Sequence, residues 1–220
     1  MANNNTKNVD NTVQEVDAAI SKSEQFVENN KNIIMYALIG IIVIVAAVWG
    51  WNKLSASNNE KAQDEIWTSQ LLFEQGQYEQ ALEGFEALIS EYGSTKSGNL
   101  AKAYAGLCNK ELGNYAKAIE QLKDFSGNDN VLAPAVLAAQ GDCLVNQENP
   151  DNKKAAELFE KAAKAADNAQ FSPLYLKKAG LAYEAAGDNA AALKAYQSIK
   201  DNWAETMSAQ TIDKYIERVK

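Results

Sequence analysis

Histidine is absent from this 220-residue sequence, and cysteine, proline and glycine are all scarce. Because there is no imidazole, Ser-His-Asp triads, Cys-His pairs and histidine metal sites are excluded. Two cysteines cannot supply a four-thiolate zinc site. Three prolines and 12 glycines argue against collagen-like, loop-rich and sandwich folds.

Basic residues are also the minority, with 21 against 29 acidic residues and a formal charge of −8. Nucleic-acid-binding domains usually carry a basic surface, so we expect no nucleic-acid partner. No Gly-rich phosphate loop is present, and acidic pairs such as Asp64-Glu65 are best read as solvated helix surface. We therefore expect no enzyme, no cofactor, no metal and no small-molecule substrate.

One long hydrophobic run is present, from Ile33 to Trp51, without a single charge. A helix of this length spans roughly the 30 Å hydrocarbon core of a bilayer, which predicts a transmembrane helix over residues 32–53. Tyr36, Trp49 and Trp51 lie near its ends, where aromatic rings favour the headgroup layer, so membrane lipid is an expected contact. A buried core helix and a cleaved signal peptide are the alternatives.

The segment before this run divides into two parts. Residues 1–12 are Asn-rich and predict a disordered tail. Residues 13–31 predict a short amphipathic helix. This helix could lie on the membrane surface, dock a cytoplasmic partner such as a channel, or be solvated without a partner. Its apolar residues are Val13, Val16, Ile20, Phe26 and Val27.

After the run, the sequence repeats itself. The turn glycines Gly76, Gly113 and Gly187 lie 37 and then 74 residues apart, and each is followed by a small alanine and a large apolar residue. A further copy with an irregular turn falls between the last two, at Ala155 and Phe159.

Small residues also precede each turn at matching positions. These positions are Ser69, Gly106, Gly141 and Gly180. Such spacing predicts helical hairpins in which the small residue allows a close approach, while the large residue fills the gap between neighbouring hairpins. We expect a stalk over residues 54–61, helical or broken near Ser55 to Asn59, hairpins over 62–202, and a capping helix over 203–220.

These copies resemble the tetratricopeptide repeat. The fourth copy carries most of the likeness, through Leu176, Ala179-Gly180, Tyr183, Gly187-Asp188, Ala192, Tyr196 and Ile199. The period of about 37 departs from the 34 residues typical of the family. The predicted fold class is all-α, with a transmembrane helix followed by a solenoid of about four repeats and a capping helix.

The resemblance implies a concave face that binds a partner polypeptide, built from the first helix of each hairpin. The alternative is that these side chains pack on neighbouring hairpins or on the cap. The candidate residues are Ile66, Gln70, Phe73, Leu107, Lys110, Ala138, Asp142, Val145, Lys177 and Leu181.

Cys108 and Cys143 occupy the same position of two repeats, equivalent to Leu71 and Ala182 in the others. We expect free thiols used as small buried hydrophobes. A disulfide is the alternative, although equivalent positions of neighbouring repeats usually lie beyond its reach.

The order of parts is similar to the YfgM family, the single-span ancillary subunit of the bacterial Sec translocon. The local likeness lies at Phe26-Val27-Glu28-Asn29-Asn30-Lys31 and at Trp49-Gly50-Trp51. The resemblance implies the bacterial inner membrane, a cytoplasmic N-terminus, and a periplasmic repeat domain. It also implies two partners, the SecYEG channel and a membrane-anchored periplasmic peptidyl-prolyl isomerase. A tethered scaffold of another envelope complex is the alternative.

Overall fold

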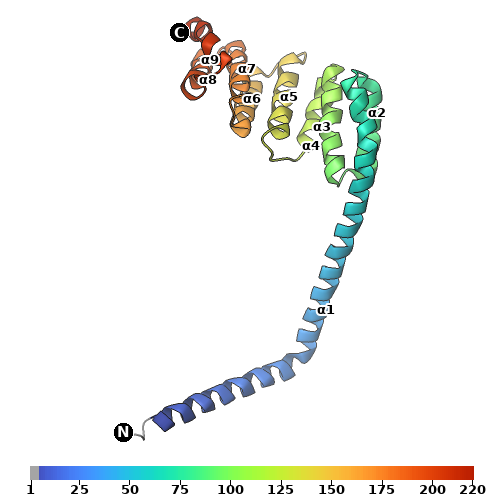
Figure 1. The fold of residues 1–220 in the computed structure, drawn as a ribbon, viewed down its shortest axis with the longest axis vertical. Coiled ribbons are helices and arrows are strands. Elements are labelled where there is room, and N and C mark those ends of the chain that lie inside the picture. The colour runs from blue at the N-terminus through green and yellow to red at the C-terminus, as the bar shows by residue number, and fades with distance from the viewer. Residues whose placement is uncertain (1–4) are drawn as a thin grey trace. The chain divides into compact units, whose positions relative to one another are not determined.

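The computed structural model describes the backbone of residues 5–220 and the side chains of residues 29–33, 35–37, 39–53 and 55–220. Every regular element in this described part is a helix, which confirms the all-α fold class (Figure 1). The chain divides into two compact units, residues 1–54 and residues 55–220.

The first unit consists of the N-terminal part of α1, which runs over Asn5–Glu74. Residues 5–12, expected as part of a disordered tail, are helical within α1. The predicted stalk, residues 54–61, is also helical, which was one of its two alternatives. The predicted contact residues Val13, Val16, Ile20, Phe26 and Val27 lie outside the residues whose side chains are described.

The described residues contain one helix, Asn29–Glu74, that is long and apolar enough to cross a membrane. None of its most apolar window is buried within the protein. Tyr36, Trp49 and Trp51 are all exposed, and the ammonium of Lys53 lies 5.5 Å from the centre of the Trp49 ring.

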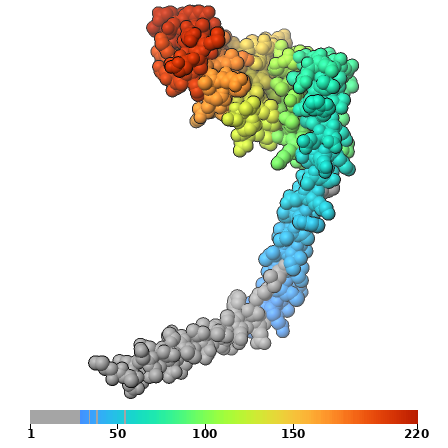
Figure 2. Space-filling view, viewed as in Figure 1, coloured from blue at the N-terminus to red at the C-terminus, as the bar shows by residue number. Residues whose placement is uncertain are grey.

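The second unit contains four helical hairpins. They follow one another in chain order, as the sequence of colours in Figures 1 and 2 shows. The end of α1 pairs with α2, and the three later hairpins are α3–α4, α5–α6 and α7–α8. The bounds are α2 Tyr78–Tyr92, α3 Lys96–Glu111, α4 Tyr115–Asp124, α5 Leu132–Asn146, α6 Asn152–Ala166, α7 Ser172–Ala185 and α8 Asn189–Asn202.

The C-terminal cap differs from the single helix that we expected. It consists of two short helices, α9 (Met207–Thr211) and α10 (Asp213–Val219). The hydroxyl of Thr206 accepts a hydrogen bond from the backbone N–H of Ala209, so α9 has its own N-terminal cap. Ile212 and Ile216 are buried against the last hairpin, as a capping element requires.

Three of the four hairpin turns depend on glycine. Gly76, Gly113 and Gly187 adopt φ angles of 75°, 77° and 77°, in the left-handed region that ends many helices. The third turn lacks this glycine. There the side chain of Asp151 accepts a hydrogen bond from the backbone N–H of Lys154 and begins α6.

Close helix approach follows the predicted pairing of small and large residues. A methyl group built on Gly180 would lie 2.1 Å from Cε1 of Tyr196, and one on Gly141 would lie 2.7 Å from Cε1 of Phe159. The large residue therefore packs over the glycine of its own hairpin as well as toward the next one. In the first hairpin the small residue on the first helix is Ser69, and the glycine that allows the close approach is Gly84, on the opposite helix α2.

The buried apolar residues form three separate clusters. The first two hairpins share nine buried residues, and the last two hairpins and the cap share twenty. Only four, Ala103, Leu122, Val136 and Ala139, form the middle cluster that joins α3 and α4 to α5. The segment between α4 and α5, residues 125–131, is irregular.

Candidate functional site

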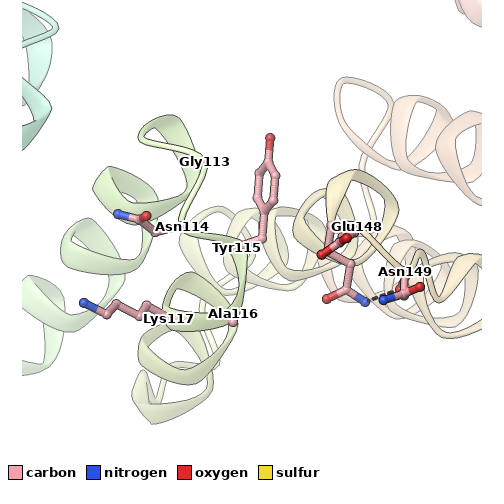
Figure 3. Close-up of a pocket in the computed structure, with 8 residues that line it drawn as sticks. Gly113, Asn114, Tyr115, Ala116, Lys117, Glu148 and Asn149 are labelled. Atoms are coloured by element: carbon pink, nitrogen blue, oxygen red, sulfur yellow. Dashed lines mark hydrogen bonds between the residues drawn. The ribbon is translucent and has the colours of Figure 1, made fainter.

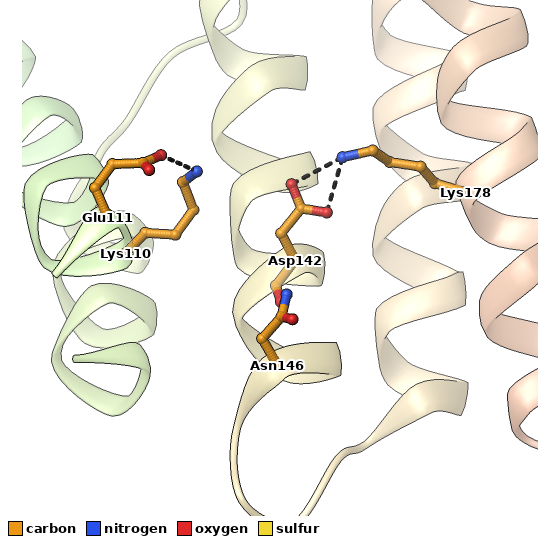
Figure 4. A network of polar contacts seen from close by, with 5 residues as sticks. All are labelled: Lys110, Glu111, Asp142, Asn146 and Lys178. Carbon is orange, nitrogen blue, oxygen red and sulfur yellow. Dashed lines mark hydrogen bonds and ion pairs between the residues drawn. The ribbon is translucent and has the colours of Figure 1, made fainter. Parts of the chain in front are cut away.

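Polar side chains form a row across α3, α5 and α7 (Figure 4). Lys178 on α7 places its ammonium 2.8 Å from both carboxylate oxygens of Asp142 on α5. On α3, Lys110 forms an ion pair with the adjacent Glu111. The Asn146 side chain donates to the backbone oxygen of Asp142 at 2.8 Å, so it supports α5 rather than joining the ion pair.

An open cavity of about 180 Å³ adjoins this ion pair, between α5, α6 and α7. Its walls are mostly apolar, and Lys178 also lies 5.5 Å from the centre of the Phe159 ring. The lining residues are Asp142, Val145, Asn152, Phe159, Lys178, Leu181, Ala182 and Ala185. The cavity is smaller than most sites for drug-sized molecules, and its chemistry suits an apolar side chain beside a polar backbone.

Three of the predicted face residues meet at this cavity, namely Asp142, Val145 and Leu181. Leu181 is 41% exposed, so an incoming side chain can reach it. Lys110 lies in the same polar row on α3 (Figure 4). Lys178 was not among the residues predicted from the sequence, although its neighbour Lys177 was.

Lys177 does not line the cavity. Its ammonium lies 4.8 Å from the centre of the Tyr215 ring in α10, so this lysine helps to hold the cap against α7. One residue along a helix changes the direction of the side chain by about 100°, which separates the roles of Lys177 and Lys178.

In the first hairpin, the predicted face is partly core. Ile66 is only 5% exposed and belongs to a buried cluster, so its assignment to an accessible face is wrong. Phe73 packs edge-on against Tyr78 and Tyr104, each with ring centres 5.4 Å apart.

The other predicted residues have mixed surroundings. Leu107 packs against the middle cluster. Ala138 is 4% exposed and belongs to the cluster of the last two hairpins and the cap. Both residues therefore belong more to the core than to an open face. Gln70 is half-buried.

A larger cavity of about 470 Å³ lies at the turns of the second and third hairpins (Figure 3). It is lined by the turn residues Gly113 and Asn114, the start of α4, and residues 147–149. The Gln147 side chain donates to the backbone oxygen of Asn149 at 2.9 Å, which shapes one wall. Six of its eight lining residues are exposed, and none belongs to a buried apolar cluster, whereas Phe159 and Ala182 of the smaller cavity do. We therefore regard the smaller cavity as the better binding site.

The two thiols are free and fully buried, as expected. Burial raises the pKa of Cys108 to about 12 and that of Cys143 to about 11, although Lys110 acts in the opposite direction on Cys143. Both thiols are therefore protonated and unreactive at neutral pH. Among the residues described by the structure, no group of three or more acidic or cysteine side chains could hold a metal ion.

Comparison with known proteins agrees with this architecture. Crystal structures of tetratricopeptide-like repeats of a putative kinesin light chain from Podosopora anserina align with a TM-score of 0.56 and 15% identity, covering 73% of this chain and 86% of theirs. A variant of the same protein gives 0.56 and 14%, with coverages of 73% and 85%.

No curated protein matches the chain. Repeats of this kind are typically non-catalytic scaffolds for protein–protein contacts. A family model described as a tetratricopeptide repeat-like domain matches residues 24–217, and the chain belongs to that family.

Proposed function

We propose that the chain is a membrane-anchored scaffold that holds an extended polypeptide on the first helices of its hairpins. The observation that carries this proposal is the cavity between α5, α6 and α7, with the Asp142–Lys178 ion pair beside it. An apolar residue of the partner would enter beside Leu181, while its backbone would exchange hydrogen bonds with the flanking polar groups. Solenoids commonly use such extended surfaces for binding.

For the cellular setting, we propose a single span over residues 32–53 in the bacterial inner membrane, with the N-terminus cytoplasmic and the repeats periplasmic. The protein would serve as an accessory subunit of the Sec channel, SecYEG. It would recruit a membrane-anchored periplasmic peptidyl-prolyl isomerase or handle emerging chains. The order of parts and the likeness to the YfgM family support this setting, and a scaffold of another envelope complex is the second candidate.

Site-specific photo-crosslinking tests the binding face. A crosslinker at Leu181, beside the cavity, should capture a polypeptide partner, and Asp142→Lys should reduce the yield because it replaces the ion pair with repulsion. Leu174 provides the matched control, since it is a similarly exposed leucine on the same helix but outside the cavity. Equal capture at both positions would contradict a specific site at the cavity.

Further experiments separate the parts of the proposed setting. Protease added to spheroplasts should digest residues 62–220 and spare the N-terminal segment, whereas protection of the repeats would invert the topology.

Replacing Ile33–Trp51 with an unrelated span, or removing residues 13–27, should weaken co-purification with the Sec channel. Removing residues 62–220 should abolish binding of the isomerase. If crosslinkers capture only structural envelope proteins, the second candidate replaces the first.

A further inference from the structure

The N-terminal edge of the solenoid exposes two large apolar side chains on α1. Trp67 is 67% exposed and Leu71 is 43% exposed, so the described part of the chain leaves a large share of both side chains uncovered. They lie one helical turn apart and therefore form a single apolar stripe. The opposite end of the solenoid is closed by α9 and α10, which bury Ile212 and Ile216.

The repeat register shows what normally covers this stripe. Trp67 and Leu71 stand two residues on either side of Ser69, as Tyr104 and Cys108 stand on either side of Gly106 in the next hairpin. Tyr104 stacks on Phe85 of α2, with ring centres 5.1 Å apart, and Cys108 is fully buried in the same cluster. In the second hairpin, α2 of the preceding hairpin thus covers the positions of Tyr104 and Cys108. The equivalent positions of the first hairpin, Trp67 and Leu71, are left open.

The charge around the stripe is strongly one-sided. Residues 55–92 hold eight acidic residues and one lysine, a formal charge of −7 in a chain whose total is −8. All eight carboxylates belong to exposed residues, and none forms an ion pair with another described residue. Asp64 and Glu74 lie one turn from Trp67 and Leu71 respectively, so they border the stripe directly.

We infer that the Trp67–Leu71 stripe is a docking surface for a basic amphipathic helix of a partner protein. The register indicates a helix as the occupant, because α2 fills the equivalent place against α3. The carboxylates around the stripe favour a basic helix by charge complementarity. A second copy of this chain would bring two hairpins of charge −7 together, and an anionic lipid surface would repel the same carboxylates. This surface is separate from the cavity between α5, α6 and α7.

A synthetic helical peptide of leucine and lysine, with the leucines along one face, provides the probe. Its affinity for the full-length protein in neutral detergent is measured by fluorescence anisotropy, with empty micelles as the baseline. We expect binding that weakens as salt rises, and a loss of about tenfold or more in Trp67→Gln/Leu71→Gln, since buried tryptophan anchors dominate such interfaces. A leucine–glutamate peptide should not bind.

The control variant is Leu174→Gln, which removes an exposed leucine from α7 and should leave the affinity unchanged. Because Trp67, Leu71 and Leu174 are all exposed, thermal unfolding should be similar in the variants and the wild type. Equal affinity of the wild type and the double variant, or equal binding of the acidic peptide, would overturn the inference. Dimerisation seen by analytical ultracentrifugation and lost in the double variant would also overturn it, by assigning the stripe to a second copy.

Discussion

The close contact between Gly180 and Tyr196 allows a sharp test of the hairpin packing. Gly180→Ala adds a methyl group at a point 2.1 Å from Cε1 and 2.5 Å from Cζ of the tyrosine ring. The ring cannot move away freely, because Tyr196 is fully buried and its hydroxyl donates to Glu184 at 2.5 Å. The helices must therefore separate, or the ring must leave its position.

Two opposing effects set the size of the change. Overpacking a well-filled contact costs about 1–3 kcal/mol, and a clash this short favours the upper end of that range. Alanine gains up to about 1 kcal/mol over glycine within a helix, which offsets part of the loss. We expect a net loss of about 1–2 kcal/mol, which corresponds to a decrease in Tm of roughly 2–8 °C for a domain of this size.

Thermal unfolding of the full-length protein in mild detergent measures this change, and Gly84→Ala supplies the matched control. The atom nearest to that new methyl group is the hydroxyl oxygen of Ser69, at 2.2 Å, which can rotate away, and the next is its Cβ at 3.2 Å. Gly84→Ala should therefore leave Tm unchanged or raise it. If both variants raise Tm equally, the close approach of Gly180 to Tyr196 is refuted.

Other groups give further predictions. Cys108 and Cys143 should resist a thiol reagent in the folded protein, react in denaturant, and show the mass of two free thiols. Arg218→Gln should lower stability slightly near pH 7, because it removes an exposed ion pair with Glu184. Burial raises the pKa of Glu184, but hydrogen bonds from Arg218 and Tyr196 hold it below its usual value. The stability that comes from this lowered pKa is present above the pKa of Glu184 in the unfolded chain and is lost as pH falls through its folded pKa. Urea titrations of the two proteins should therefore converge at acidic pH, once Glu184 is protonated.

The hairpin architecture was predictable because a physical constraint recurs in every repeat. In each repeat a small residue lets the two helices approach closely, and in three of the four repeats the turn between them carries a glycine. These residues recur with a fixed period, which a single helix would not require. The first hairpin satisfies the same constraint with Ser69 on α1 and Gly84 on α2, so its glycine lies on the second helix rather than on the first.

Which residues of the first helices reach the binding face depends on the direction of each side chain around the helix axis. The repeat spacing determines that direction only approximately. Lys177 and Lys178 are adjacent in sequence, yet one contacts the cap and the other the cavity. Ile66 was assigned to the accessible face, whereas it is 5% exposed in the core. The division of the cap into α9 and α10 occurs at Ile212 without any glycine or proline, so no local signal marked it.

The small middle cluster has a mechanical consequence. Four buried residues, against nine and twenty in the clusters on either side, join α3 and α4 to α5. Because each repeat of a solenoid is stabilised mainly by its neighbours, the chain should separate first at this junction when it is pulled from its two ends. The force–extension curve should then show two unfolding events, with the third and fourth hairpins and the cap unfolding as the more resistant block.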